Sequence, residues 1–113
     1  MISDHVRIRH MLDAVNEIID FTSYKSRKDL DNDRKLCLSL VHLLEIVGEA
    51  ANGISNDMRD KYDNIPWQSV IDMRNRLIHG YFDIDLDIVW KTVEKDIPRL
   101  KHDLEVIIQK EDI

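Results

Sequence analysis

The sequence predicts an all-α fold, a single helical-bundle domain over residues 1–113 with about five helices. Of the 113 residues, 43% are hydrophobic and 34% are charged, a composition that suits one globular core. The chain has only three glycines and two prolines, so the turn signals of a β-sandwich or barrel are sparse. Apolar residues also recur at helical spacing in several stretches. These observations favour long helices over strands.

A first helix is expected from Asp4 to about Thr22, because Ser3 followed by an acidic residue is a start signal. The next stretch, "SYKSRKDLDND", is polar and lacks an apolar period. We therefore expect a connecting loop there, whose Asx residues cap the next helix. The apolar face of the first helix comprises Ile8, Met11, Leu12, Val15, Ile18 and Ile19.

The second helix, over residues 33–52, is expected to be central because it is apolar on more than one face. Gly48, Ala50 and Ala51 near its end would let another backbone come close. Either a tight crossing within the chain or a dimer seam would explain these small residues. Glu45 is expected to be an ordinary polar residue at the edge of this helix.

Three further helices are expected beyond Gly53, which is a natural helix stop. A short helical segment precedes Pro66, and Pro66 itself favours the first turn of a helix that ends near Gly80. The stretch "FDIDLD" then links to a long last helix, which Pro98 is expected to kink or split. The apolar positions of this last helix are Leu86, Trp90, Val93, Ile97, Leu100, Leu104 and Ile107.

The charge balance limits the partners that the chain can bind. Its formal net charge is −6 and its pI is about 5.2, which disfavours phosphate backbones and anionic membranes, so any nucleic-acid contact must be local. Cys37 lies among leucines, where a buried thiol fits better than a disulfide or a metal ligand. No apolar run reaches the roughly 20 residues of a membrane span, and no signal peptide follows Met1. We expect a soluble, cytoplasmic protein.

The stretch "RNRLIHGY", residues 74–81, places a guanidinium in the apolar stripe of the expected helix. Arg74 should therefore be buried, and it then needs an acidic partner, an open cavity or an anionic ligand. The candidate acidic partners are Glu49, Asp83 and Asp85. On a regular helix His79 lies roughly 140° around from Arg74, so the two cannot share one compact site. A long arginine side chain, unwinding at Gly80, or a second copy of the helix across a dimer axis would bring them together. The dimer requires the fewest distortions.

Histidine beside arginine suits phosphodiester cleavage, since the imidazole can move a proton while the guanidinium stabilises charge on the phosphate. Attack by an RNA 2′-hydroxyl would need no metal, and the sequence has no HExxH, cysteine-pair or P-loop motif. From residue types alone, a salt-bridged arginine and a helix-capping histidine remain an alternative.

The same stretch matches a sequence pattern of the HEPN superfamily. In that pattern an arginine is followed by a polar residue, then by variable residues and then by a histidine. Its Gly-Tyr ending resembles the HepT-like toxin branch, in which a tyrosine lies two residues after the histidine. The surrounding segments "VGEAAN", "IPWQSVIDMRNRLIHGYFDID" and "VWKTVEKDIPRL" are also similar to that family, so the resemblance covers most of the chain.

The resemblance implies an all-helical homodimer with a cleft between protomers, and the toxin of a type VII toxin–antitoxin system. The toxin would be a metal-independent endoribonuclease without a cofactor, acting on RNA and not on DNA. Carried over to this sequence, Arg74 and His79 are the catalytic pair and Asn75 supports them. Tyr81 would receive AMP from ATP, transferred by an MntA-type nucleotidyltransferase antitoxin encoded nearby.

Two other readings stay open. The chain could be a non-catalytic, nucleotide- or protein-binding helical dimer partnered with a nucleotidyltransferase, in which Arg74 is only an anion anchor. It could also be a structural helical protein, in which Arg74 pairs internally with Glu49.

Overall fold

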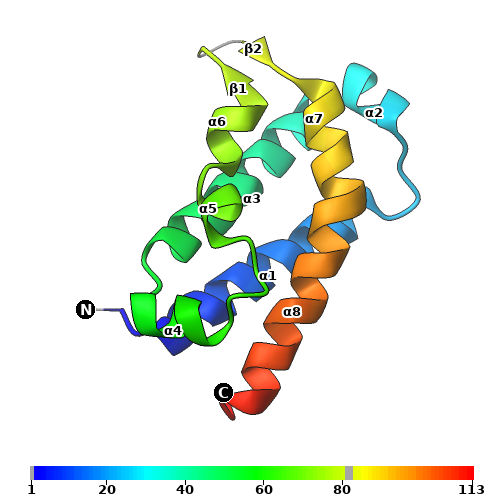
Figure 1. Ribbon diagram of the computed structural model, residues 1–113. Coiled ribbons are helices and arrows are strands. Elements are labelled where there is room, and N and C mark those ends of the chain that lie inside the picture. Colours follow the sequence, from blue (N-terminus) through cyan, green and yellow to red (C-terminus); the bar gives the residue numbers. More distant parts are fainter. Residues whose placement is uncertain (1, 81–82) are drawn as a thin grey trace.

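The computed structural model describes residues 2–80 and 83–113 (Figure 1). Helices make up most of this part of the chain, and the described residues form one small sheet, a two-stranded hairpin. The buried side chains of all the longer helices belong to one hydrophobic cluster. The predicted all-α fold is confirmed. None of the described helices is long and apolar enough to cross a membrane.

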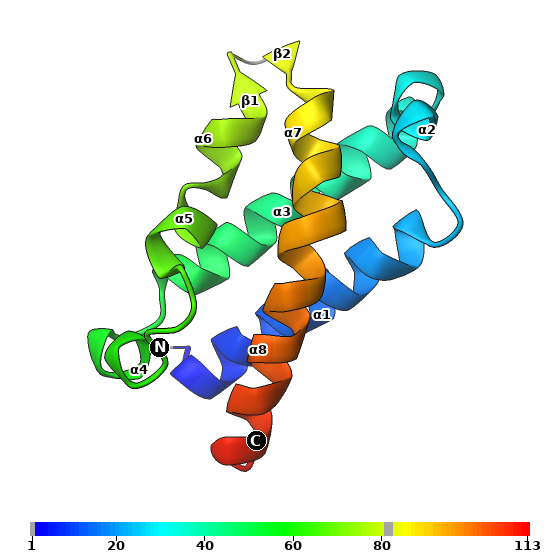
Figure 2. The ribbon, with the colours of Figure 1, turned by 45° about the vertical axis from the view of Figure 1, so that its right-hand side comes forward.

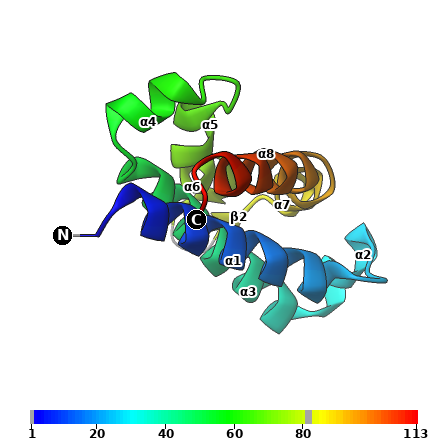
Figure 3. The same ribbon diagram turned by 90° about the horizontal axis from the view of Figure 1, so that it is seen from below.

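Helix α1 (Asp4–Thr22) has the predicted bounds. The hydroxyl of Ser3 accepts a hydrogen bond from the backbone N–H of Val6 at 3.2 Å, so the predicted start signal acts as an N-cap. The apolar face of α1 packs on α3 (Arg34–Asn52) and on α8 (Ile97–Lys110). Seen from below, α8 lies between α1 on one side and α4 and α5 on the other (Figure 3).

The predicted loop after α1 is wrong in part, because it contains a short helix, α2 (Arg27–Asn32). The backbone N–H of Ser26 donates to the Asp29 carboxylate at 2.6 Å, which closes a capping box at the start of this helix. Leu30 is its one buried residue. A single apolar anchor gives no period, so the hydrophobic pattern could not reveal α2.

Helix α3 is central, as predicted, and packs on α1, α5 and α6. Gly48 faces α5 (Trp67–Ile71) at close range. A Cβ atom at this glycine would lie 3.1 Å from the carbonyl oxygen of Val70 and 3.2 Å from that of Ile71. Of the two explanations for the small residues, the tight crossing within the chain therefore accounts for Gly48 without a dimer seam.

The short helix before Pro66 is confirmed as α4 (Asn56–Lys61), but the next predicted helix is interrupted. It consists of α5 and α6 (Met73–Leu77), which meet at Asp72 with φ −82° and ψ 4°. The N–H of Asn75 donates to the carbonyl of Asp72 at 2.9 Å, a tighter turn than in an α-helix. This kink changes the direction of the chain just before the motif.

The predicted helix also ends earlier than expected. Strand β1 (Ile78–His79) follows α6 and pairs antiparallel with β2 (Asp83–Ile84), with His79 opposite Asp83. Gly80 has φ +81°, a left-handed conformation that glycine adopts without strain, so it serves the hairpin rather than a helix end. The hairpin projects beyond α6 and α7 at one end of the molecule (Figure 2).

The last helix is one continuous rod (Figure 2), and its hydrogen-bond pattern changes along its length. Helix α7 (Leu86–Lys91) continues into a π-helical segment, η1 (Thr92–Asp96), and then into α8. The N–H of Ile97 donates to the carbonyl of Thr92, five residues earlier. The disturbance that was predicted for Pro98 is therefore a widened turn placed just before the proline, which lacks an N–H.

Glu111, just after α8, connects the C-terminal end to the end of α4 and to the start of α1. Its Oε2 accepts hydrogen bonds from Lys61 Nζ at 2.7 Å and from the Tyr62 hydroxyl at 2.5 Å. His5 Nε2 lies 3.6 Å from the other carboxylate oxygen. These contacts, with Lys61 first, lower the pKa of Glu111 to about 2.

Candidate active site

Arg74 lies on α6 and its side chain is 57% exposed, so the predicted burial is wrong. The interruption at Asp72 explains the difference, since α6 does not continue the phase of α5. Met73 and Leu77, one turn apart, take the buried face of α6 instead. Arg74 then points away from the core.

The partner of Arg74 is Glu45 of α3, which was expected to be an ordinary edge residue, and not Glu49, Asp83 or Asp85. The Nε atom of Arg74 lies 3.6 Å from Oε1 of Glu45. Within residues 2–80 and 83–113, no hydrogen bond engages the terminal amino groups of Arg74. The forked end of the guanidinium is therefore available to an anion.

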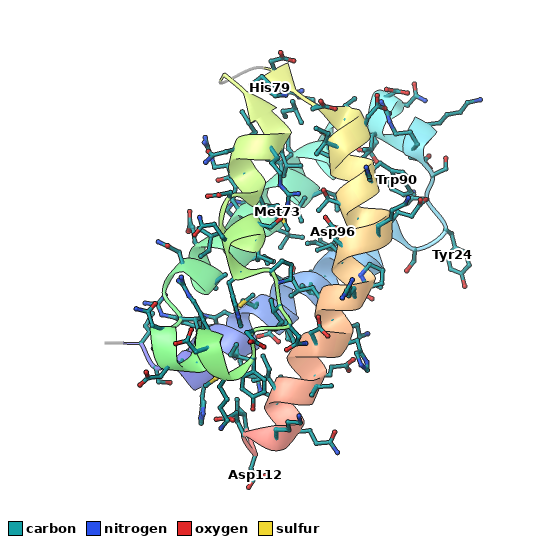
Figure 4. The ribbon with its side chains drawn as sticks, viewed as in Figure 1. Tyr24, Met73, His79, Trp90, Asp96 and Asp112 are labelled. Atoms are coloured by element: carbon teal, nitrogen blue, oxygen red, sulfur yellow. The ribbon has the colours of Figure 1, made fainter. Side chains whose placement is uncertain are left out.

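His79 lies at the end of β1, at the hairpin end of the molecule (Figure 4). Its side chain is 56% exposed, and its Nε2 lies 3.7 Å from Oδ2 of Asp85. Two hydrogen bonds hold Asp85 in place. Its backbone N–H donates to the backbone carbonyl of Leu77 at 2.8 Å, and its Oδ1 accepts from the backbone N–H of Ile88 at 3.1 Å. One carboxylate thus caps α7 and faces the imidazole.

Asn75 is exposed on α6, and its described hydrogen bond is the backbone one to Asp72. Tyr81 lies outside the described residues. The structure therefore gives Arg74 and His79 a separate carboxylate each, and within the described chain no hydrogen bond joins the two side chains. Unwinding after α6, which was one of the three ways to unite them, occurs but does not bring them into contact.

His79 borders a cleft of about 510 Å³ between the hairpin end of α6 and the last helix. Arg76 and Lys91 line the same cleft, together with Ile88, Thr92 and Asp96. Sequence reasoning missed Glu45, Arg76 and Lys91 as members of the site. Glu45 and Lys91 reach it from other helices that no local pattern connects to the motif, whereas Arg76 lies inside the motif at a position that the pattern leaves variable. Among the described residues, no group of three His, Cys, Asp or Glu side chains could hold a metal ion.

Comparison with known proteins identifies relatives over most of the chain. The family model described as "Ribonuclease HepT-like" matches residues 11–107. The chain is 37% identical over 97 residues to "Putative RNase MJ1380" of Methanocaldococcus jannaschii, which covers 86% of this chain and 89% of that protein. It is 38% identical over 94 residues to "Probable ribonuclease HepT" of Thermococcus cleftensis, and the alignment covers 83% of this chain and 86% of that protein.

A third relative is "Putative RNase TTE0752" of Caldanaerobacter subterraneus, 35% identical over 104 residues, or 92% of this chain and 93% of that protein. No solved structure gives a significant match. The matched region contains α3, α6, the hairpin and the cleft beside His79. By sequence and by its helical architecture, the chain belongs to the HepT-like ribonuclease family of the HEPN superfamily.

Proposed function

We propose that the chain is a metal-independent endoribonuclease and the toxin of a type VII toxin–antitoxin pair, with Arg74 and His79 as its catalytic residues. The observation that carries the proposal is the imidazole of His79, held against Asp85 on the wall of a cleft. An exposed guanidinium with an unoccupied fork lies five residues earlier in the chain. Membership of a ribonuclease family supports RNA as the substrate.

In the proposed reaction, His79 removes the proton from an RNA 2′-hydroxyl, and that oxygen attacks the adjacent phosphorus. The bond from phosphorus to the 5′-oxygen breaks, the departing oxygen takes up a proton, and a 2′,3′-cyclic phosphate remains. Arg74 stabilises the charge that develops on the phosphate oxygens. Because Nε2 of His79 faces Asp85, Nδ1 is the ring nitrogen that accepts the proton from the 2′-hydroxyl in this proposal.

A second copy of the chain would complete the site. Within one protomer Arg74 and His79 have separate partners, Glu45 and Asp85. A two-fold axis near α6 would bring Arg74 of one protomer to His79 of the other, as an isologous interface allows. We therefore propose a homodimer with composite clefts and with Asn75 as a polar support at the rim.

The proposed off-state is covalent. An MntA-type nucleotidyltransferase, encoded beside this gene, would transfer AMP from ATP to the Tyr81 phenol and release pyrophosphate. Tyr81 follows His79 by two residues in the sequence, and His79 borders the cleft. The added phosphate and adenine would compete with RNA for the guanidinium of Arg74.

Expression of the chain alone, and together with the neighbouring nucleotidyltransferase gene, tests the function. We expect growth arrest and RNA fragmentation in the first case and rescue in the second. The purified protein should cleave RNA in the presence of EDTA. Intact RNA at full growth arrest would contradict the nuclease proposal and favour the binding-module alternative. Cleavage that EDTA abolishes would contradict the metal-independent mechanism.

Intact-mass spectrometry tests the off-state separately. The native protein, incubated with the antitoxin, ATP and Mg²⁺, should gain the mass of one or more AMP groups. The Tyr81→Phe variant should gain none. The same added mass on Tyr81→Phe would remove Tyr81 from this role while leaving the nuclease proposal intact.

A further inference from the structure

A second cavity continues the cleft beside His79. It has a volume of about 320 Å³, and it shares Arg76 and Asp96 with the 510 Å³ cleft. Met73 and Asp96 lie on its two sides, one from α6 and the other from η1, and His79 lies at the far end beyond them (Figure 4). We call the two cavities together the α6–α8 groove.

The charges along the groove differ from those of the whole chain. Three cationic side chains line it, Arg76, Lys91 and Arg99, against two acidic ones, Asp96 and Asp103. The groove therefore has one excess positive charge on a chain whose formal net charge is −6. In the part of the chain that the structure describes, none of the three cations forms an ion pair, so their charges are available to a ligand.

Arg76 lines both cavities, at the place where they meet. Its Nη2 donates to the backbone carbonyl of Ser69 at 3.2 Å, which fixes the guanidinium with one donor and leaves the others unused. The groove floor between the cations is apolar, since Met73 and Leu100 line it and are almost fully buried. Cationic rims over an apolar floor suit a strand whose phosphates are charged and whose bases have apolar faces.

Lys91 and Arg99 are spaced for more than one phosphate. They lie eight residues apart on the continuous last helix, about 12 Å along its axis. Successive phosphates of one strand are only about 3.4 Å apart along a duplex axis. The separation of the two residues along the helix therefore exceeds the spacing of successive phosphates, so a strand of several nucleotides can engage both side chains.

We propose that the α6–α8 groove binds a single-stranded stretch of RNA, with phosphates at Arg76 and Arg99, and leads it to His79. This inference rests on the proposed ribonuclease function and assigns Arg76 and Arg99 as substrate-binding residues outside the catalytic pair. A local positive track explains how a chain of net charge −6 holds a polyanion.

The test measures binding and cleavage separately. A fluorescent single-stranded oligonucleotide with 2′-O-methyl groups throughout has no free 2′-hydroxyl, so the unmodified protein can bind it without cleaving it. Fluorescence anisotropy, recorded over a range of salt concentrations, gives Kd and its salt dependence. The variants are Arg76→Gln and Arg99→Gln, with Asp103→Asn as a reversed charge change in the same groove and Lys35→Gln of α3 as an off-groove control.

We expect Arg76→Gln and Arg99→Gln each to weaken binding about tenfold. Each should reduce the slope of log Kd against log salt by about 0.7, the value for one lost phosphate contact on a single strand. Asp103→Asn should tighten binding, and Lys35→Gln should leave it unchanged. Circular dichroism of each variant checks the fold, and Arg99→Gln removes no described hydrogen bond of the chain.

The outcomes separate this inference from the proposed function. If the native protein cleaves RNA but both arginine variants bind like Lys35→Gln, the groove inference is wrong and the nuclease proposal stands. If the native protein binds through the groove but cleaves no RNA, the nuclease proposal fails and the groove stands. If the variants keep full RNA affinity but lose a co-purifying protein partner, the groove is a protein-binding surface and the inference is overturned.

Discussion

Arg74 of α6 and Glu45 of α3 form an ion pair across two helices, with Nε 3.6 Å from Oε1. The pair engages the inner side of the guanidinium and leaves the fork exposed. A carboxylate on the rigid central helix therefore sets the direction of the arginine, while the solvent side stays open to a phosphate. Removing either catalytic candidate should consequently affect chemistry far more than folding.

Arg74→Ala and His79→Ala should each lower RNA cleavage by about 100-fold or more, because one removes charge stabilisation and the other the proton-transfer group. Since both side chains are more than half exposed, the free energy of unfolding should change by less than about 1 kcal/mol. Gel electrophoresis of RNA and thermal denaturation measure the two effects. Arg34→Ala, an exposed arginine at the start of α3, is the matched control.

Asp85 should act both as a helix cap and as a positioning group for His79, and two substitutions separate the roles. Asp85→Asn keeps a good N-cap for α7 but removes the charge that faces the imidazole. Asp85→Ala loses both, so it should also cost about 1 kcal/mol of stability. We expect reduced kcat in both variants and a lower Tm only in the alanine variant. Normal kcat in Asp85→Asn would exclude the positioning role.

The composite site predicts that two inactive variants complement each other. When Arg74→Ala and His79→Ala chains exchange subunits, about half of the dimers are mixed, and each mixed dimer has one intact site of two. The mixture should recover about a quarter of the native activity. Sedimentation equilibrium should show a dimer at micromolar concentration. A monomer there, or a mixture that stays inactive, would contradict the shared site.

Glu111 predicts a pH-dependent contribution to stability. Its pKa falls from 4.5 to about 2 in the folded chain, so the native state binds the proton more weakly than the unfolded state does. The stabilisation is fully present above pH 4.5 and is lost as the pH falls toward about 2. The Tm difference between the native protein and Glu111→Gln should therefore be constant above pH 4.5 and shrink below it. A difference that does not depend on pH would contradict the assignment.

Gly48→Ala should destabilise the fold by about 1–3 kcal/mol, because the new methyl group meets two backbone carbonyls of α5 that cannot rotate away. Chemical denaturation measures the change, and Glu49→Ala, the exposed neighbour on α3, should stay within about 0.5 kcal/mol of the native protein. An unchanged denaturation midpoint in Gly48→Ala would show that α3 and α5 can move apart to accommodate the methyl group at little cost in free energy.

The long helices were predictable because their evidence is local. The period of α1 and its Ser3 cap give its bounds, and α3 has buried apolar residues on more than one face from Leu36 to Ala51. The break at Asp72 was not predictable, since a single residue between two short helices barely disturbs the apolar spacing. Its effect on the site is large, because it turns Arg74 outward and changes its partner.

The partners of the site residues were also beyond local reasoning. Glu45 precedes Arg74 by 29 residues, and only the packing of α6 on α3 brings the two together. Asp85 was a candidate partner for Arg74, but the hairpin between β1 and β2 places it beside His79. The motif thus named the two candidate catalytic residues, while the tertiary fold decided which carboxylate lies beside each one.

The π-helical turn at Thr92–Asp96 sets the angular phase of the last helix. In a regular α-helix, Lys91 and Arg99 would lie about 80° apart around the axis, since eight residues advance about 800°. One widened turn makes eight residues advance roughly as seven, about 700°, which is within about 20° of two full rotations. The extra residue in the widened turn therefore rotates α8 relative to α7, so that Lys91 and Arg99 lie on the same side of the last helix. Deleting a single residue from this turn would rotate Arg99, and with it the buried face of α8, by about 100° relative to α7.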